Sequence, residues 1–458
     1  MFVAREQELF QIQEQLSDSK RKTVFLIYGR RRVGKSKLIQ EAIRNFHGIT
    51  INHLCVRSSY EGNLRLLGRN VARSFSYNGI QFEDLFDIFD FIARQQKPCV
   101  LVLDEYSYLK ESRPKGEIDS MLQGIADSLP PYVKLILCGS YVTQMQELIH
   151  EDNPLFGRLT GVLHLKSFDY LDASLMAKHL SCRQKIEQYA VFGGVPYVLE
   201  NLHPDSPISE DIIEGLINPN GLLRIFIEDV ALKEIRKSFD ERILECLGNG
   251  KKRYSEIEAF LCSNSSLNTD KQLKALMEMD MIEKVYPINK PNDAKKRFYS
   301  ISDNLLRFYF TFIFGNEDLI NRLGPAAYYE EYIKTKLLTF MSLRFESIAL
   351  QYFRRLAVHG RLKGVDDFGT FWYDDAGTRT NRQFDCVLHR KEGYDFYECK
   401  LYDKPMKKKE CIQEESQIRS IGIPCFKIGF VCSAGFDFQD DQYYLISEKD
   451  LYAEELLK

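Results

Sequence analysis

Short, continuous apolar runs alternate with segments of helical spacing over the first 170 residues of the chain. The runs cover residues 23–28, 99–103 and 133–137. Apolar runs of this length are typical of strands that are buried on both faces, as they are in a parallel sheet. The alternation predicts an α/β domain over residues 1–170, with a mainly parallel sheet and helices on both of its faces.

Helical spacing dominates the next part of the chain. Residues 171–235 are predicted to form a helical lid around the sequence Phe192-Gly193-Gly194-Val195-Pro196. Three short amphipathic helices follow at 241–247, 254–261 and 269–279, and a hairpin-like stretch occupies 283–301. Three helices followed by a hairpin are typical of a winged helix-turn-helix, which we assign to residues 236–315.

The pattern returns to mixed α/β in the last part, residues 316–458. A long helix is expected near 328–359, and strands are expected at 369–373, 383–389, 395–401 and 427–432. The sequence thus predicts four parts: an α/β domain, a helical lid, a winged helix-turn-helix and a separate C-terminal α/β domain.

The first apolar run is followed directly by a Walker A motif, G-R-R-R-V-G-K-S, and then by a helical pattern. Glycines let such a loop curl so that its N–H groups and the helix N-terminus converge on phosphate oxygens. Lys35 is expected to neutralise the β- and γ-phosphates, and Ser36 to place its hydroxyl on Mg²⁺. The predicted nucleotide-binding residues of the loop are Gly29, Arg30, Arg31, Arg32, Val33, Gly34, Lys35, Ser36 and Lys37. The motif predicts binding of ATP or GTP, and the three arginines add positive potential near the phosphates or face solvent or a partner.

The next two apolar runs end in polar residues that suit nucleotide hydrolysis. Asp104 is the expected anchor for Mg²⁺, and Glu105 beside it is placed to polarise the attacking water. Ser140, after the third run, is a candidate sensor of the γ-phosphate. Arg158 is a candidate for stabilising transition-state charge, within its own chain or across a subunit boundary. The alternatives are a solvated acidic pair closing a strand and, for Arg158, a surface salt bridge.

A second set of candidate chemical groups lies near the C-terminus. Asp385 stands inside the predicted strand 383–389, and strand periodicity puts Glu398 and Lys400 on one face of the strand 395–401. If these strands pair as a hairpin, Asp385 lies beside Glu398. Two carboxylates suit Mg²⁺ or Mn²⁺, and Lys400 is placed to orient water or to stabilise a pentacovalent phosphate. The alternative is a solvated strand face on which acids and lysines alternate.

Composition limits where nucleic acid can bind. The net charge is -3, from 62 basic and 65 acidic residues, so there is no global basic field and any such site is local. The expected recognition helix has a balanced charge, and only the wing, with Lys290, Lys295, Lys296 and Arg297, is distinctly basic.

Cysteine usage and the N-terminal pattern indicate the compartment. The eleven cysteines include no C-x-x-C pair, which argues against a disulfide framework or a zinc site and favours a reducing compartment. No secretory signal is apparent at the N-terminus, and the most apolar window, residues 308–314, is too short to span a bilayer. We therefore expect a cytoplasmic protein without membrane association.

Four motifs together resemble an archaeal-type ATPase of the STAND group within the AAA+ superfamily. They are Arg5-Glu6-x-Glu8-Leu9, the Walker A loop from Tyr28 to Ser36, Leu103-Asp104-Glu105 and Gly194-Val195-Pro196. The resemblance implies ATP in preference to GTP. It also implies that the first and last of these motifs flank the adenine, with Phe2, Val3 and Pro196 near the base. The chain has Ala4 where that group usually has glycine.

The C-terminal candidates resemble the core of PD-(D/E)xK nucleases, a restriction-endonuclease-like fold. In that resemblance Glu346, on the preceding helix, is the upstream acid that joins Asp385 and Glu398 as a metal ligand, and Gln417 is a helix partner. The accessory C-terminal domain of the STAND-group ATPases, long described as of unknown function, is similar to that fold. Winged-helix modules of the group often act as intramolecular arms that report nucleotide state.

These patterns predict an ATP-binding and ATP-hydrolysing switch coupled to a C-terminal metal-dependent nuclease. Its cofactors would be ATP and Mg²⁺, with Mn²⁺ as an alternative at the C-terminal site, and its partner would be nucleic acid, DNA in preference to RNA. The alternative is a regulator or remodelling protein whose C-terminal domain binds nucleic acid or protein without cleavage. Assembly into a homo-oligomer or with a protein partner stays open.

Overall fold

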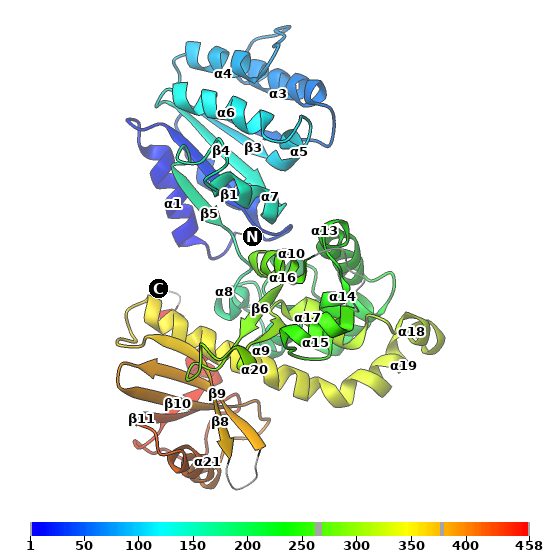
Figure 1. Cartoon of the computed structure of the whole chain (residues 1–458), viewed down its shortest axis with the longest axis vertical. Helices are drawn as coiled ribbons and strands as arrows, with labels where there is room; N and C mark the ends of the chain where they lie inside the picture. The colour runs from blue at the N-terminus through cyan, green and yellow to red at the C-terminus, as the bar shows by residue number, and fades with distance from the viewer. Residues whose placement is uncertain (1, 262–267, 376–379, 457–458) are drawn as a thin grey trace. The chain divides into compact units, whose positions relative to one another are not determined.

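The computed structural model describes residues 2–261, 268–375 and 380–456, and the chain divides into two compact units, Met1–Lys166 and Ser167–Lys458 (Figure 1). The first unit contains a five-stranded sheet in the order β2-β3-β4-β1-β5. All its described neighbouring strands run parallel, so the predicted parallel α/β domain is confirmed. The strands are β1 (Thr23–Tyr28), β2 (Ile49–Leu54), β3 (Cys99–Asp104), β4 (Val133–Gly139) and β5 (Gly161–His164).

Helices cover both faces of this sheet. One face packs its alternate apolar residues, such as Phe25 and Ile136, against Ile12 of α1 and Leu38 of α2 in one buried cluster. Figure 1 shows α3, α4 and α6 on the other side of the sheet from α1. The helices are α1 (Glu6–Ser17), α2 (Lys35–Ile43), α3 (Tyr60–Ser74), α4 (Leu85–Arg94), α5 (Tyr106–Lys110), α6 (Glu117–Ser128) and α7 (Val142–Gln146).

The apolar runs predicted the three central strands and missed both edge strands. Strand β2 alternates between buried and exposed residues, because one of its edges and part of its surface face solvent. Strand β5 has only four residues, and its Val162 is exposed. An edge strand does not need the continuous apolar run that marks a strand buried on both faces.

The second unit begins with a helical segment. Helix α9 starts with a capping box at Ser181 and ends at Gly193, whose φ is 68°. Gly194 packs so tightly that a Cβ there would lie 1.9 Å from the carbonyl oxygen of Phe168. Pro196 then occupies the first turn of α10, where its missing N–H costs nothing. The helices are α8 (Tyr170–Ser174), α9 (Cys182–Phe192), α10 (Pro196–Glu200), α11 (Ile208–Glu210), α12 (Leu222–Ile225) and α13 (Leu232–Ser238), with π-helical turns at Asp211–Ile217 and Phe226–Ala231.

Three helices and an antiparallel hairpin follow, and we call them together the three-helix module. They are α14 (Arg242–Gly248), α15 (Tyr254–Leu261), α16 (Thr269–Glu278), β6 (Ile282–Val285) and β7 (Phe298–Ile301). The side chain of Asn268 caps α16 by accepting a hydrogen bond from the backbone N–H of Lys271. Helices α17 (Asn304–Phe312), α18 (Glu317–Leu323) and α19 (Pro325–Tyr328) connect the module to the C-terminal part.

The C-terminal part is a five-stranded mixed sheet in the order β12-β11-β10-β9-β8. Strands β8, β9 and β10 are antiparallel neighbours, whereas β10, β11 and β12 run parallel. The elements are α20 (Lys334–Val358), β8 (Asp367–Asp375), β9 (Thr380–Arg390), β10 (Gly393–Lys400), α21 (Lys408–Ser420), β11 (Cys425–Cys432), β12 (Tyr444–Ser447) and α22 (Glu448–Leu451). The expected long helix is shorter than predicted, because a π-helical turn at Tyr329–Ile333 precedes it.

Helices cover this second sheet as well. Cys411 and Ile418 of α21 join Phe396 and Phe430 of the strands in one buried cluster. Phe353 of α20 packs on Tyr397 with ring centroids 4.3 Å apart. Helix α20 therefore packs against β10, the strand that carries Glu398 and Lys400.

The three-helix module contacts the edge strand β8. Pro287, in the loop of its hairpin, pairs with Thr370, and the side chain of Asn289 donates a hydrogen bond to the carbonyl oxygen of Trp372 at 2.9 Å. Ile288 is buried in the core of the C-terminal sheet. Covering an edge strand in this way satisfies backbone groups that would otherwise pair with another chain. The module therefore has a defined position relative to the C-terminal strands.

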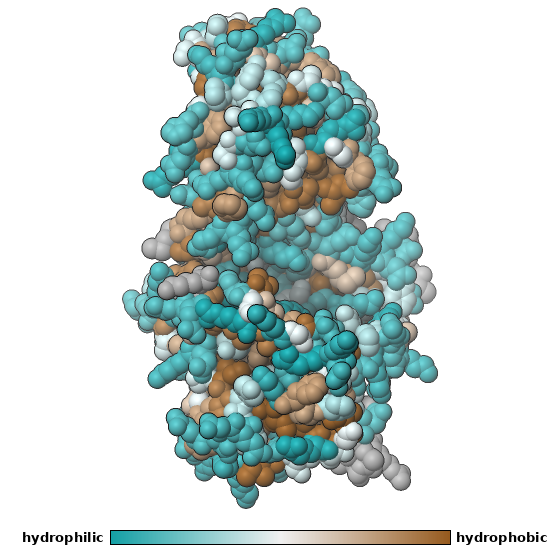
Figure 2. Space-filling view, turned by 90° about the vertical axis from the view of Figure 1, so that its left-hand side faces the viewer, coloured by the Kyte–Doolittle hydropathy of each residue, from teal (hydrophilic) through white to brown (hydrophobic). Residues whose placement is uncertain are grey.

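Several large apolar side chains of the second unit are exposed. Ile412, Phe426 and Tyr444 are each about half exposed, at 51%, 54% and 46%. Figure 2 shows hydrophobic patches of this kind separated by hydrophilic surface on the face it presents. Over residues 2–261, 268–375 and 380–456, no helix is both long enough and apolar enough to cross a membrane.

Candidate functional site

The Walker A loop joins β1 to α2, and a lysine side chain of the loop is hydrogen-bonded to the loop's own backbone. The Nζ atom of Lys35 is buried and donates to the carbonyl oxygens of Gly29 and Arg30, at 2.7 and 2.9 Å. Gly34, at φ 98°, begins α2 and so directs the N-terminus of the helix at the loop. A Cβ on Gly29 would lie 2.1 Å from the carbonyl oxygen of Leu165, so only glycine fits there. Burial lowers the pKa of Lys35.

Strand order brings three further predicted residues to this loop. Strand β4 lies between β1 and β3, so Ser140, which follows β4, and Asp104, the last residue of β3, meet the loop at the carboxyl edge of the sheet. The hydroxyl of Ser36 donates to Oδ2 of Asp104 at 2.7 Å. The hydroxyl of Ser140 donates to both carboxylate oxygens of Glu105, at 2.8 and 2.7 Å. The predicted loop serine, strand-end aspartate, glutamate and sensor serine thus occupy one edge.

One of the three loop arginines contacts aromatic side chains. Arg31 donates to the hydroxyl of Tyr108 at 2.8 Å, and its guanidinium lies 5.1 Å from the ring centroid of Tyr141. Glu105 is close enough to act on the charge of Arg31. Tyr108 and Tyr141, which sequence analysis did not single out, therefore hold this arginine beside the predicted catalytic glutamate. Arg32 adopts a left-handed backbone conformation, with φ 68°.

Arg158 lies at the opposite edge of the sheet. It precedes β5, which runs parallel to β1, and the N–H of the nearby Thr160 donates to the carbonyl oxygen of Val24 at the start of β1. Its guanidinium pairs with Asp127 at 3.3 Å. A strand the length of β1 separates it from the Walker A loop by about 20 Å. The interpretation that Arg158 acts on the phosphates of its own chain is therefore wrong, whereas action across a subunit boundary stays a prediction.

The N-terminal segment keeps a glycine-like backbone in spite of Ala4. Ala4 has φ 55° and is buried, although alanine rarely adopts this left-handed conformation. Arg5 pairs with Glu8 at 2.9 Å and donates to the carbonyl oxygen of Lys166. The segment that includes Phe2 and Val3 is thus fastened to the first unit. Pro196 belongs to the second unit, so its place near the adenine stays a prediction.

The residues at the Walker A loop fit ATP with Mg²⁺. Ser36 and Asp104 supply oxygen atoms, the ligands that Mg²⁺ prefers, and their hydrogen bond shows that the two side chains meet. When bound, Mg²⁺ neutralises charge on the β- and γ-phosphates. Lys35 supplies a further positive charge at the loop, and Glu105 supplies a second carboxylate at the same edge of the sheet.

The C-terminal candidates come together because β9 and β10 pair as a hairpin. Tyr397 is the partner of Cys386 in the antiparallel register, so Asp385 and Glu398 are the next residues on the two strands. Lys400 donates to Oε1 of Glu398 at 2.6 Å and pairs with Glu414 of α21 at 3.3 Å. The predicted pairing of the two strands is therefore found, and Glu414 completes the surroundings of Lys400.

Glu346, on α20, belongs to the same group of charges. Burial raises the pKa of Glu346 to about 7, against the opposing charge of Arg344. Burial and the charge of Glu346 raise the pKa of Asp385 to about 7, and burial and the charge of Asp385 raise that of Glu398 to about 8. Against the effect of burial, Glu398 raises the pKa of Lys400. Perturbed carboxylates facing one another are typical of functional sites.

Gln417 is directed elsewhere than predicted. Its Oε1 accepts a hydrogen bond from Nη1 of Arg382 at 3.4 Å. The residue of α21 that reaches Lys400 is Glu414, three positions earlier on the helix. A one-turn offset of this kind depends on how α21 packs on the sheet, which the spacing of residues does not reveal.

The donors of the C-terminal group suit a cation held by two carboxylates. Within the described part of the chain, no three His, Cys, Asp or Glu side chains lie close enough together to hold a metal ion. Asp385 and Glu398 supply two neighbouring carboxylates here, and the charge of Glu346 acts on Asp385. The expectation that Glu346 is a third ligand is not supported.

Two protein families match separate parts of the chain. Residues 2–202 match an ATPase domain predominantly from Archaea. This segment includes the Walker A loop, Asp104, Glu105 and Ser140, which the sheet brings to one edge. The chain carries a P-loop ATPase domain. Residues 309–413 match a family described as Archaea bacterial proteins of unknown function, and this segment includes Glu346, Asp385, Glu398 and Lys400.

Two known proteins are similar to this chain over most of its length. An uncharacterized protein of Methanocaldococcus jannaschii is 28% identical over 356 residues, which cover 77% of each chain. A Walker-type ATPase of Pyrococcus abyssi has a similar fold, with a TM-score of 0.50 and 20% identity over 68% of this chain and 96% of that chain. This likeness supports the P-loop ATPase fold.

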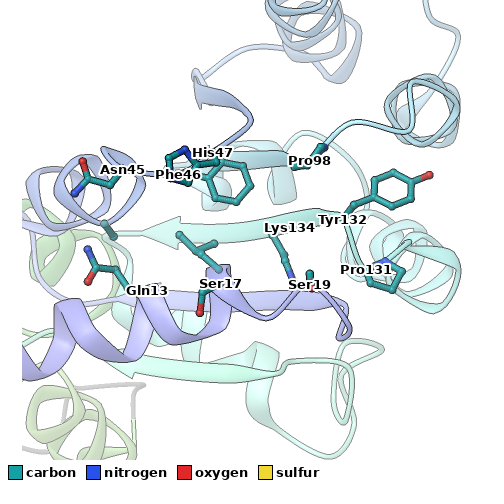
Figure 3. Close-up of a pocket in the computed structure, with 12 residues that line it drawn as sticks. Gln13, Ser17, Ser19, Asn45, Phe46, His47, Pro98, Pro131, Tyr132 and Lys134 are labelled. Atoms are coloured by element: carbon teal, nitrogen blue, oxygen red, sulfur yellow. The ribbon is translucent and has the colours of Figure 1, made fainter.

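The ATPase domain also has a pocket of about 540 Å³ at the amino edge of its sheet, away from the Walker A loop. Figure 3 shows Gln13 and Ser17 of α1 on one side of it and Phe46 and Lys134 on the other. The Nζ atom of Lys134 donates to the backbone carbonyls of Asp18 and Arg21, at 2.5 and 2.6 Å. Because its donors are used locally, the lysine does not make this pocket a second phosphate site.

Sequence analysis missed several cations around the C-terminal carboxylates. Lys251 of the three-helix module lies 3.3 Å from Oε1 of Gln383, and Arg344 on α20 acts on the charge of Glu346. Arg307 of α17 is close enough to Arg344 for their charges to interact. Arg344 stands two residues before Glu346, which is a weak signal in the sequence. Lys251 and Arg307 reach the site only through the packing of the three-helix module and of α17.

Proposed function

We propose that the chain is an ATP-dependent switch whose C-terminal sheet carries a metal-dependent site for hydrolysis of phosphodiester bonds in nucleic acid. The observation that carries this proposal is the hairpin of β9 and β10, which sets Asp385 beside Glu398 with Lys400 bonded to Glu398. Two carboxylates and an amine in one place are what metal-assisted phosphodiester hydrolysis needs. The resemblance of these residues to the PD-(D/E)xK arrangement is a further argument for the proposal.

Each residue has a distinct task in this proposal. Asp385 and Glu398 hold the cation, which when bound polarises a phosphoryl oxygen and activates water. Lys400, kept charged by Glu398, stabilises negative charge on the phosphate. Burial, and then the charge of Glu346, keep the pKa of Asp385 high.

At the ATPase domain, we propose that Glu105 orients the attacking water and that Ser140 positions Glu105. Lys35 and Ser36 hold the phosphates and Mg²⁺. The lid around Pro196 and the three-helix module, which we interpret as a winged helix, would respond to the γ-phosphate and so regulate the C-terminal site. Such coupling requires an element with two states that the nucleotide biases.

A binding function without cleavage is the second candidate. Lys400 forms an ion pair with Glu398 at 2.6 Å. Within the described residues, the acidic side chains do not form a cluster of three metal ligands. A site of that kind can bind nucleic acid or a protein without hydrolysing it. This alternative predicts retained nucleic-acid binding and no cleavage with any cation.

Cleavage assays with single variants test the proposal. Plasmid DNA, single-stranded DNA and RNA are incubated with purified protein and Mn²⁺ or Mg²⁺, with and without ATP. Asp385→Ala should abolish cleavage and leave ATP hydrolysis intact. Glu392→Gln, at the exposed turn between β9 and β10, is the matched control and should cleave as the wild type does. Cleavage that survives in Asp385→Ala would exclude this site, and no cleavage by the wild type would favour the binding alternative.

A further inference from the structure

Two arginines of the second unit have buried donors without partners. Nη1 of Arg307, on α17, and Nε of Arg344, on α20, are both buried and make no hydrogen bond to the residues that the structure describes. A buried N–H group of a charged side chain that loses water without gaining an acceptor costs free energy. Such a group therefore indicates a missing acceptor.

No described carboxylate forms an ion pair with either arginine. Arg307 donates to the hydroxyl of Ser300 at 2.6 Å. Glu283 and Glu346 act on both arginines only through their charges. Burial and then the charge of Arg344 lower the pKa of Arg307 to about 9, so the two arginines are close enough for their like charges to interact. An anion between them would relieve this repulsion and supply the acceptors.

A third cation extends this arrangement toward the C-terminal carboxylates. Lys251, after α14, lies 3.3 Å from Oε1 of Gln383 and 4.4 Å from the ring centroid of Trp372. Gln383 is on β9, two residues before Asp385. Glu346 is close enough to act on the charge of Lys251. The three cations thus come from three elements that border the same group of acids.

We propose that Arg307, Arg344 and Lys251 form a subsite for backbone phosphates of a nucleic-acid strand whose neighbouring phosphodiester lies at Asp385 and Glu398. The inference rests on the proposed function of those two carboxylates. Guanidinium groups present planar forks of donors that match phosphate oxygens. A phosphodiester supplies both the charge and the acceptors that Arg307 and Arg344 lack.

The arrangement favours a strand over a small phosphate compound. The cations are spread over α17, α20 and the loop after α14, so several consecutive phosphates can engage them. The net charge of -3 means that such a local set of cations, and no general basic field, must attract the backbone.

Binding assays without cleavage test the subsite. The affinity of full-length protein for fluorescent single-stranded and duplex DNA oligonucleotides is measured in Ca²⁺ over a range of salt. Arg344→Met and Arg307→Met should each weaken binding by roughly tenfold and reduce the slope of log K against log salt by about 1. Arg354→Met, an exposed arginine of the same helix, is the control and should bind as the wild type does. Unchanged affinity in both test variants would overturn the proposal.

Thermal unfolding separates binding from a structural role. In phosphate-free buffer, Arg344→Met should unfold at the same temperature as the wild type or a higher one, because an unpaired charge is removed. A large fall in unfolding temperature would show a structural role and count against the subsite. DNA oligonucleotide should stabilise the wild type more than inorganic phosphate does. Equal stabilisation by both would show a site for free phosphate and overturn the assignment to a strand.

The same variants distinguish this inference from the nuclease proposal. Asp385→Ala should abolish cleavage, whereas Arg344→Met and Arg307→Met should weaken the binding of DNA. If the wild type cleaves no substrate but Arg344→Met loses binding, the subsite is supported and hydrolysis is not. If the wild type cleaves DNA but the arginine variants bind and cleave normally, hydrolysis is supported and the subsite is overturned.

Discussion

Ser140 donates its hydroxyl to both carboxylate oxygens of Glu105, at 2.8 and 2.7 Å, and its backbone N–H lies 3.3 Å from the same carboxylate. Glu105 itself has a left-handed backbone, with φ 53°, so its side chain is directed by both strain and hydrogen bonds. A carboxylate held in this way is preorganised at the carboxyl edge of the sheet, beside the Walker A loop.

Ser140→Ala should therefore slow ATP hydrolysis without weakening nucleotide binding. Loss of a positioning contact is expected to lower kcat by about tenfold, and Glu105→Gln, which removes the base itself, by about 10²-fold or more. Steady-state hydrolysis and nucleotide titration measure the two quantities separately. Faster hydrolysis in Ser140→Ala would show that the serine restrains Glu105.

Lys35→Ala should remove measurable ATP binding. The buried ammonium is the positive charge placed at the phosphates, and Ser36 and the loop N–H groups alone cannot offset their charge. Lys97→Ala, an exposed lysine at the amino edge of the same sheet, serves as the control. Titration with a fluorescent ATP analogue gives the affinities. An unchanged affinity in Lys35→Ala would contradict the assignment of the nucleotide site.

Arg158→Ala should leave ATP affinity unchanged at low protein concentration, because Arg158 faces Asp127 at the far edge of the sheet. If the arginine acts across a subunit boundary, wild-type hydrolysis per chain should rise with protein concentration and the variant should lose that rise. Hydrolysis measured over a hundredfold concentration range tests this. Loss of activity in a strictly monomeric sample would contradict the position described for Arg158.

The stability of the C-terminal part should fall as pH rises. The pKa of Asp385 is raised from 3.8 to about 7 and that of Glu398 from 4.5 to about 8, so the folded state binds more protons than the unfolded state between these values. The stabilisation is fully present below about pH 4 and is lost as pH rises through 7 to 8. At about 1.4 kcal/mol per pKa unit, the expected loss between pH 6 and pH 8.5 is on the order of 4 kcal/mol. Urea unfolding at pH 6 and pH 8.5, in EDTA, measures it.

Divalent cations should reverse this trend. Because a metal ion at Asp385 and Glu398 competes with protons, Mn²⁺ should stabilise the protein more at pH 8.5 than at pH 6. Glu398→Gln should reduce both the pH dependence and the effect of Mn²⁺. A stability curve in EDTA that rises with pH over this range would contradict the raised pKa values.

Several features could be inferred from the order of residues alone. The Walker A loop occupies eight consecutive positions, so its geometry depends on local backbone conformation, with Gly29 and Gly34 at the turns. The central strands could be found because strands buried on both faces need continuous apolar runs. Strand periodicity was enough to put Glu398 and Lys400 on one face, and a hairpin with β9 follows from the short turn at Gly393.

The positions of the other side chains depend on long-range packing. The free energy that determines this packing comes from contacts between residues far apart in the chain. Ser140 meets Glu105 only because β4 lies between β1 and β3. The direction of β5 sends Arg158 to the far edge, and the packing of α21 brings Glu414, in place of Gln417, to Lys400. Arg307 and Arg344 are 37 positions apart, and their approach depends on how α17 and α20 pack. Local spacing carries no information about such an approach, since burial and register are properties of the whole fold.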